Sequence, residues 1–125
     1  MSVQLPVNEI ERYRFAERLL GMKDPLGALM MLEPLLQEHG DDRGLQELAA
    51  RAYYHSAQLG RARQALTSLL ERDPSDHYAR FLLGRTLERS SLLTEALPHL
   101  RMAAAMHADP DYAESVGRVE RKLAA

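Results

Sequence analysis

The 125-residue sequence repeats itself at a fixed interval of 34 residues, and this period limits the folds that it can adopt. A shift of 34 aligns small residues with small ones and large apolar residues with large ones, without any gap. The aligned sets are Ala28, Ala62 and Ala96; Leu32, Leu66 and Leu100; Ala16, Ala50 and Gly84; and Leu19, Tyr53 and Leu87. Units of this length bury their apolar faces against their neighbours, so the period predicts a stack of repeated units.

The composition indicates that each unit is helical. Only eight residues are β-branched, whereas leucine and alanine together number 39. Strands favour β-branched side chains and helices favour leucine and alanine, so the chain is predicted to be all-α. Asn8 before Glu11, and Asp24 before Pro25, are typical helix starts. The expected helices span about 9–20, 25–39, 43–56, 59–72, 77–89, 92–107 and 111–122.

The helices group into three pairs and a final cap within one domain. The expected parts are an extended arm at 1–8, repeats at 9–42, 43–76 and 77–110, and a capping helix at 111–125. The cap has one apolar face and one polar face that we expect to meet solvent. The apolar face holds Tyr112, Val116, Val119 and Leu123, and the polar face holds Glu114, Arg118, Glu120, Arg121 and Lys122. Gly40 is expected to end the second helix in a left-handed conformation, and Pro34 to kink that helix.

Charge and composition exclude several classes of protein. The net charge of −2 argues against a dedicated nucleic-acid binder, which is usually strongly basic. The chain lacks cysteine, an apolar run long enough for a membrane span, and a basic leader at residues 1–8. We therefore expect a soluble cytoplasmic protein. Arginine outnumbers lysine 14 to 2, which we interpret as the codon bias of a GC-rich bacterial genome, with selection of arginine for ion pairing as the alternative.

The repeat resembles the tetratricopeptide repeat family over residues 9–125. The shared features are the 34-residue period, a small residue followed three later by a large one, as in Gly84 and Leu87, and Asp73-Pro74 closing a unit. The family's usual tryptophan is replaced by Arg12, Gln46 and Arg80. The resemblance implies a right-handed α-solenoid of three antiparallel helix pairs with a capping helix. It also implies a non-enzymatic scaffold that binds a peptide or protein in the concave groove lined by first helices.

The resemblance allows the groove to be mapped onto this sequence. The expected groove residues are Tyr13, Arg14, Glu17, Glu47, Arg51, Tyr54, His55, Tyr78, Phe81, Arg85, Glu88 and Arg89. Phe15 and Tyr53 are expected to pack in the core instead. Aromatic and arginine side chains together are typical of binding hot spots, and mixed charges favour a mixed or modestly acidic ligand. Ion pairing along a solvated helix face is the alternative explanation for these charges.

One subtype of the family is excluded. Members that hold the carboxylate tail of heat-shock chaperones use lysine, asparagine and arginine at five positions. This sequence has Tyr13, Glu17, Leu48, Tyr78 and Leu82 there. None of these residues matches, and Glu17 would repel a carboxylate, so we do not expect a chaperone tail as the partner.

No motif predicts catalysis, a cofactor or a metal. The sequence has no pair of histidines at metal-binding spacing on one helix and no glycine-rich phosphate loop. His39 and His107 occupy matching places near helix ends, where interaction with the helix dipole accounts for them. We therefore expect no enzymatic activity, with neither nucleic acid nor membrane as a partner.

The alternative function is self-assembly. The extended arm at 1–8 could lie in its own groove or in that of another copy. Apolar residues at the ends of the repeats, including Met22, Met30 and Met31, could also pair two molecules.

Overall fold

The computed structural model describes residues 8–125, and these form seven α-helices and no strand. The helices are α1 (Glu9–Gly21), α2 (Pro25–Glu38), α3 (Arg43–His55), α4 (Leu59–Arg72), α5 (His77–Arg89), α6 (Leu93–Met106) and α7 (Pro110–Ala124). Every expected helix is present, with ends within two residues of those expected, so the all-α fold is confirmed for this part of the chain. The arm predicted at 1–8 lies outside the described residues, except for Asn8.

The 34-residue period recurs in the helix caps. Asn8, Asp42 and Asp76 precede α1, α3 and α5, and each side chain accepts a hydrogen bond from the third residue after it. The donors are the backbone amides of Glu11, Leu45 and Ala79, at 2.7, 2.9 and 3.0 Å. These bonds satisfy amides that a helix start otherwise leaves unpaired, so the same capping position sets the start of each first helix.

The period recurs again in the short turns inside the helix pairs. Lys23, Ala57 and Ser91 have φ of 65°, 61° and 63°, and they are spaced 34 residues apart. No glycine in residues 8–125 has a positive φ, so the expectation of a left-handed Gly40 is wrong. The sharp reversal lies within each pair, where three residues join antiparallel helices. α2 instead ends at Glu38, and the capping residue His39 after it has a φ of −134°.

Packing divides the chain into two compact units, residues 1–58 and residues 59–125, which we call the first and second units. Each is described by itself. The division falls between α3 and α4, which are the two helices of the repeat predicted at 43–76. The predicted repeat boundaries stay a prediction.

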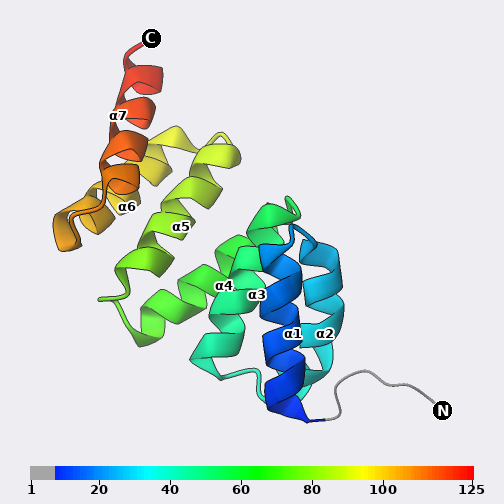
Figure 1. Ribbon diagram of the computed structural model, residues 1–125. Coiled ribbons are helices and arrows are strands. Elements are labelled where there is room, and N and C mark those ends of the chain that lie inside the picture. The colour runs from blue at the N-terminus through cyan, green and yellow to red at the C-terminus, as the bar shows by residue number, and fades with distance from the viewer. Residues whose placement is uncertain (1–7) are drawn as a thin grey trace. The chain divides into compact units, whose positions relative to one another are not determined.

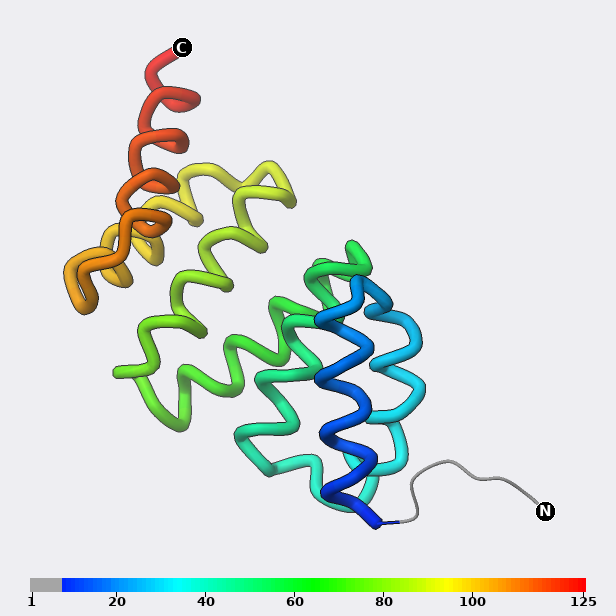
Figure 2. The backbone as a smooth tube through the Cα atoms, in the orientation of Figure 1, coloured from blue at the N-terminus to red at the C-terminus, as the bar shows by residue number. Residues whose placement is uncertain are grey.

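In the first unit, α1 and α2 form an antiparallel pair and α3 packs beside them (Figures 1 and 2). The core holds the aligned alanines and leucines that the repeat singled out. Its buried members are Ala16, Leu20, Ala28, Met31, Leu32, Leu35, Leu45, Leu48, Ala49 and Ala52. Phe15 and Tyr53 pack against this core as expected. α2 continues as a helix through Pro34, which is exposed.

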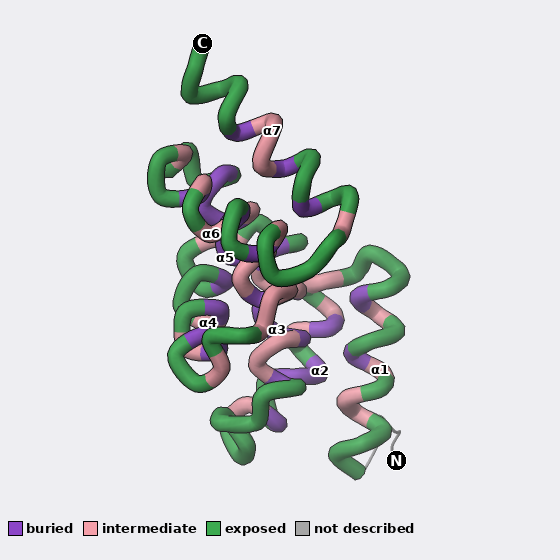
Figure 3. Tube along the Cα trace, turned by 90° about the vertical axis from the view of Figure 1, so that its left-hand side faces the viewer, coloured by how far each residue is buried: buried purple, intermediate pink, exposed green. Residues whose placement is uncertain are grey.

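In the second unit, α4, α5, α6 and α7 pack in chain order (Figure 1). α5 and α6 approach closely at Gly84, where an added Cβ atom would lie 2.6 Å from Leu100 Cδ2. The small residue of the repeat therefore permits a close helix contact, as its alignment indicated. Buried positions recur at helical spacing along one side of α7, at Tyr112, Ser115 and Val119 (Figure 3).

Candidate functional site

Four of the predicted groove residues, Tyr13 and Glu17 on α1 and Glu47 and Arg51 on α3, interact electrostatically within the first unit. Tyr13 on α1 is half-buried, and burial together with the carboxylates of Glu17 and Glu47 raises the pKa of its hydroxyl. The guanidinium of Arg51 on α3 lowers the pKa of the same hydroxyl. The phenol of Tyr13 thus interacts electrostatically with two carboxylates and a guanidinium from the two helices.

The remaining predicted residues of α1 and α3 differ in exposure. Arg14 and His55 are exposed, and Glu47 and Arg51 are half-buried. Tyr54 is only 8% exposed, so the expectation that its side chain is open to a ligand is wrong. It lies one turn after Ala50, which is fully buried, and shares that side of the helix.

A pocket of about 460 Å³ opens beside Tyr13, within the first unit. Residues from the start of α1, the end of α2 and the start of α3 surround it. Its lining is Glu9, Ile10, Tyr13, Leu35, His39, Asp42, Gly44 and Leu45. The repeat pattern did not reveal this pocket, because it forms where three helix ends meet and only Tyr13 belongs to the predicted groove.

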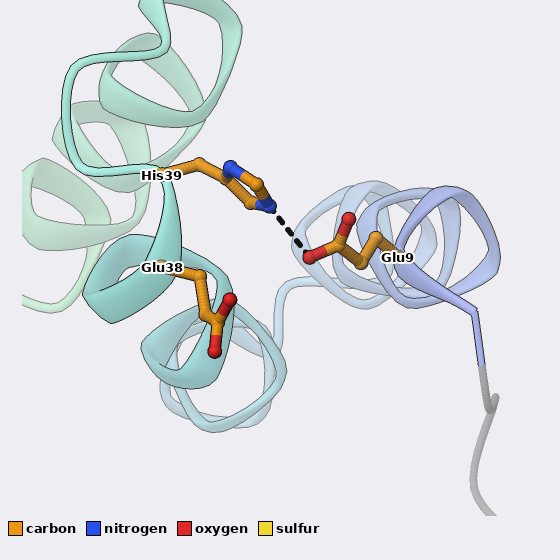
Figure 4. A group of neighbouring side chains, drawn as sticks. All are labelled: Glu9, Glu38 and His39. Carbon is orange, nitrogen blue, oxygen red and sulfur yellow. Dashed lines mark hydrogen bonds and ion pairs between the residues drawn. The ribbon is translucent and has the colours of Figure 1, made fainter.

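One group of side chains in residues 8–125 has the composition of a metal site. Oxygen and nitrogen atoms of Glu9, Glu38 and His39 lie within 4.8 Å of one another, and all three residues are exposed (Figure 4). His39 Nε2 lies 2.6 Å from Glu9 Oε2 (Figure 4). This hydrogen bond between the start of α1 and the end of α2 accounts for the arrangement without a metal. It also explains His39 better than an interaction with the helix dipole alone.

On α5, Glu88 binds the capping helix, so the expectation that it faces a ligand is wrong. Its side chain is buried, with the residue 7% exposed. Arg118 on α7 donates from Nε and Nη2 to the two carboxylate oxygens at 2.7 and 2.9 Å. Lys122 Nζ donates to Glu88 Oε2 at 3.1 Å. The hydrogen bonds from Arg118 lower the pKa of Glu88 from 4.5 to about 2, although burial acts in the opposite direction. Arg85 Nε lies 3.4 Å from the same carboxylate.

Phe81 also contacts α7. Its ring stacks on that of Tyr112 with centroids 4.4 Å apart, and Tyr112 is 3% exposed. His77 Nδ1 lies 2.9 Å from the Tyr112 hydroxyl, and its ring stacks on His107 at 4.1 Å. α7 therefore covers part of the α5 face that was expected to bind a ligand. Of the predicted α5 residues, Tyr78 is half-buried and Arg89 is exposed.

The polar side of α7 is only partly a solvent face. Arg118 and Lys122 reach Glu88, whereas Glu114 and Glu120 are exposed as expected. Sequence reasoning missed this ion-pair cluster because its two sides are 30 and 34 residues apart. The available signal was the separation of Glu88 and Lys122, which equals the 34-residue period and pairs an acidic residue of α5 with a basic one of the capping helix.

An apolar stripe runs along the outside of the first unit. Met22, in the turn before α2, is 75% exposed, and Leu26 and Met30, one turn apart on α2, are 61% and 73% exposed. Met31, which was grouped with them, is instead buried in the core. Among residues 8–125, no helix has both the length and the apolar character needed to cross a membrane.

Comparison with solved structures shows the fold. The structure named "MamA MSR-1 C2" matches with a TM-score of 0.82 and 13% sequence identity, over 94% of this chain and 68% of that one. The structure named "MamA AMB-1 P212121" matches with a TM-score of 0.77 and 15% identity, over 91% and 63%. The chain thus spans about two thirds of the length of these proteins. Identities this low show a shared fold alone.

Comparison with sequence families is more specific. No curated protein matches the chain. The family model described as "Tetratricopeptide repeat" matches residues 19–85, which is more than half of the chain. This range runs from the last turn of α1 into the second half of α5 and contains two members of each of the four aligned sets. The chain belongs to the tetratricopeptide repeat family.

Proposed function

We propose that the chain is a non-catalytic protein-binding module whose peptide or protein partner contacts the face formed by α1 and α3. Tetratricopeptide repeats are protein-interaction scaffolds, and membership of that family supports the general function. The observation that supports the site is that Glu17, Glu47 and Arg51, from two helices, all interact electrostatically with the half-buried phenol of Tyr13.

The chemistry of this face suits recognition of a polypeptide. A half-buried tyrosine loses little side-chain freedom on binding, and it offers both an apolar ring and a hydroxyl to a partner. Arg51 and Glu47 are also half-buried, and beside Tyr13 they offer a cationic hydrogen-bond donor and an anionic acceptor. The proposal rests on the first unit, because Phe81 and Glu88 of α5 already contact α7.

Affinity capture tests this proposal. The full chain is immobilised and exposed to an extract of its own source cells, and bound proteins are quantified by mass spectrometry. Replacing Arg51 and Glu47 together, as Arg51→Ala and Glu47→Gln, should remove the captured partner. Glu33→Ala on the exposed side of α2 is the matched control, and it should leave capture unchanged. Circular dichroism checks that each variant is folded. Equal capture by the double variant and the native chain would overturn the proposed site.

Self-assembly is the second candidate, and the exposed stripe of Met22, Leu26 and Met30 is the observation in its favour. Large apolar side chains that are exposed together are typical of surfaces that contact another protein. Sedimentation velocity over a wide concentration range separates the two functions. A monomer at every concentration argues against self-assembly, whereas a dimer that Met30→Glu dissociates would establish it.

A further inference from the structure

The pocket beside Tyr13 combines apolar walls with acidic groups. Ile10, Leu35 and Leu45 give it side walls from three different helices. Glu9 and Asp42 add carboxylates to the lining. A site of this kind matches a side chain with a long aliphatic stem and a cationic end, because the stem buries apolar area while the charge meets the carboxylates.

The surroundings of the pocket increase its negative character. The carboxylates of Glu17, Glu47 and Asp42 all raise the pKa of the Tyr13 hydroxyl, and the Arg51 guanidinium lowers it. Glu38 lies within 4.8 Å of the Glu9–His39 pair. The whole first unit carries nine acidic and six basic side chains, a net charge of −3, whereas the second unit carries nine and ten, a net charge of +1.

Two features of the pocket disfavour a cationic ligand, but their effect is weaker than that of the carboxylates. The start of α3 borders the pocket, and a helix start carries about half a positive charge. Asp42 caps that start by accepting a hydrogen bond from the Leu45 amide at 2.9 Å, and its full negative charge exceeds the helix contribution. His39 contacts Glu9 and so competes with a ligand for that carboxylate. Asp42, Glu17 and Glu47 are separate carboxylates, and all three affect the Tyr13 hydroxyl.

We propose that this pocket binds an arginine side chain, flanked by apolar residues, of a basic peptide segment in the partner protein. This inference rests on the proposed function and names the chemistry of the partner. Arginine fits better than lysine because its planar guanidinium can bond carboxylates with two hydrogen bonds and stack on an aromatic ring. The sequence alone favoured a mixed or modestly acidic ligand, since the pocket-lining Glu9 and Asp42 lay outside the predicted groove.

A peptide titration followed by NMR tests the pocket on the full chain. The probe is an acetylated and amidated heptapeptide with a central arginine between leucines and glycines, in buffer with EDTA. A second peptide carries citrulline in place of arginine, which keeps the shape and removes the charge. We expect the arginine peptide to shift the amide signals of Ile10, Tyr13 and Leu45, and to bind about three- to tenfold more tightly than the citrulline peptide.

Variants of the lining sharpen the test. Asp42→Asn keeps a residue able to cap α3, and Glu9→Gln keeps a hydrogen-bonding group beside His39. Together they should weaken binding of the arginine peptide about three- to tenfold, without changing that of the citrulline peptide. Glu33→Gln removes one negative charge from the exposed side of α2 and should have no effect beyond weak long-range attraction.

Three outcomes would overturn the inference. Equal affinity for the two peptides would exclude recognition of the cation, and shifts confined to other helices would exclude the pocket. Shifts of the same amides on raising protein concentration alone would assign the pocket to a second copy of the chain. If capture of the native partner still depends on Glu47 and Arg51 while the peptide fails to bind, the arginine pocket fails and the proposed function stands.

Discussion

At the scale of single residues, Gly84 shows how the repeat controls packing. It lies on α5 where α6 crosses, and a Cβ atom there would lie 2.6 and 2.7 Å from Leu100 Cδ2 and Cγ. Leu100 is fully buried, so its side chain has little space into which to move. The aligned positions Ala16 and Ala50 carry a methyl group and are also fully buried. The third copy of this position therefore has the tightest helix contact of the three.

We predict that Gly84→Ala destabilises the second unit by about 1–2 kcal/mol, because overpacking exceeds the gain from better helix propensity. Gly60→Ala is the control. Gly60 is exposed in α4 with no atom near an added Cβ, so alanine there should stabilise the protein by about 0.5 kcal/mol. Urea unfolding of both variants measures these changes. Stabilisation by Gly84→Ala would contradict the close contact between α5 and α6.

At the scale of helices, Glu88 holds the capping helix to the second unit. One carboxylate accepts hydrogen bonds from Arg118 and Lys122 on α7, while Arg85 lies beside it on α5. Removing one partner from a buried ion-pair group leaves the others uncompensated, and this costs more than the loss of an exposed pair. α7 is therefore fixed by an ionic contact as well as by the apolar contact of Tyr112 with Phe81.

We predict that Glu88→Gln destabilises the docking of α7 by about 2 kcal/mol and speeds hydrogen exchange of its amides. The cause is loss of the charge that pairs with Arg118 and Lys122. Glu114→Gln is the matched control, because Glu114 is exposed and lies 3.8 Å from the same arginine. It should change stability by less than about 0.5 kcal/mol. Identical exchange in the two variants would show that the ion-pair cluster does not hold α7.

The same contact predicts a pH dependence. The pKa of Glu88 is lowered from 4.5 to about 2 in the folded chain, so the unfolded chain binds its proton more readily. The stabilisation is therefore complete above pH 4.5 and is lost as the pH falls towards 2. The difference in stability between the native chain and Glu88→Gln should shrink between pH 6 and about pH 3 in urea unfolding. A constant difference across this range would contradict the shifted pKa.

The helices also show which features could be predicted from the sequence. The caps at Asn8 and Asp24 and the helix ends, to within two residues, followed from local signals, because capping involves residues only a few positions apart. Glu88 and Arg118 could not be paired in the same way, since either side of that contact is an ordinary charged residue of a helix surface. Tyr54 was misassigned for a similar reason, because residues at neighbouring helical positions differ sharply in burial.

At the scale of the whole molecule, the two units differ in charge and in the state of their first-helix faces. The first unit is acidic, with a net charge of −3, and a pocket of about 460 Å³ opens beside Tyr13 where the ends of α1, α2 and α3 meet. In the second unit, with a net charge of +1, α7 contacts Phe81 and Glu88 of α5. The repeat predicted the same role for all first helices, but the capping helix makes the α5 face different. This difference supports the proposal that the partner binds the first unit.

The charge of the first unit predicts that partner binding depends on salt. Attraction between its acidic face and a basic partner is screened as ionic strength rises, because the Debye length falls from about 10 Å at 0.1 M to about 3 Å at 1 M. Capture of the native partner should therefore weaken between 0.05 M and 0.5 M sodium chloride, by about tenfold. Capture that strengthens with salt would indicate an apolar contact, such as the stripe at Met22 and Met30, as the main interface.

The most direct test is site-specific photo-crosslinking in the source cells. A benzophenone amino acid replaces Tyr13 on the proposed binding face, or Met30 on the exposed stripe of α2. The account predicts that position 13 crosslinks to a different protein, that this product is lost when Glu47→Gln and Arg51→Ala are added, and that position 30 gives no such product. A crosslink from position 30 to a second copy of the chain, with none from position 13, would contradict the account.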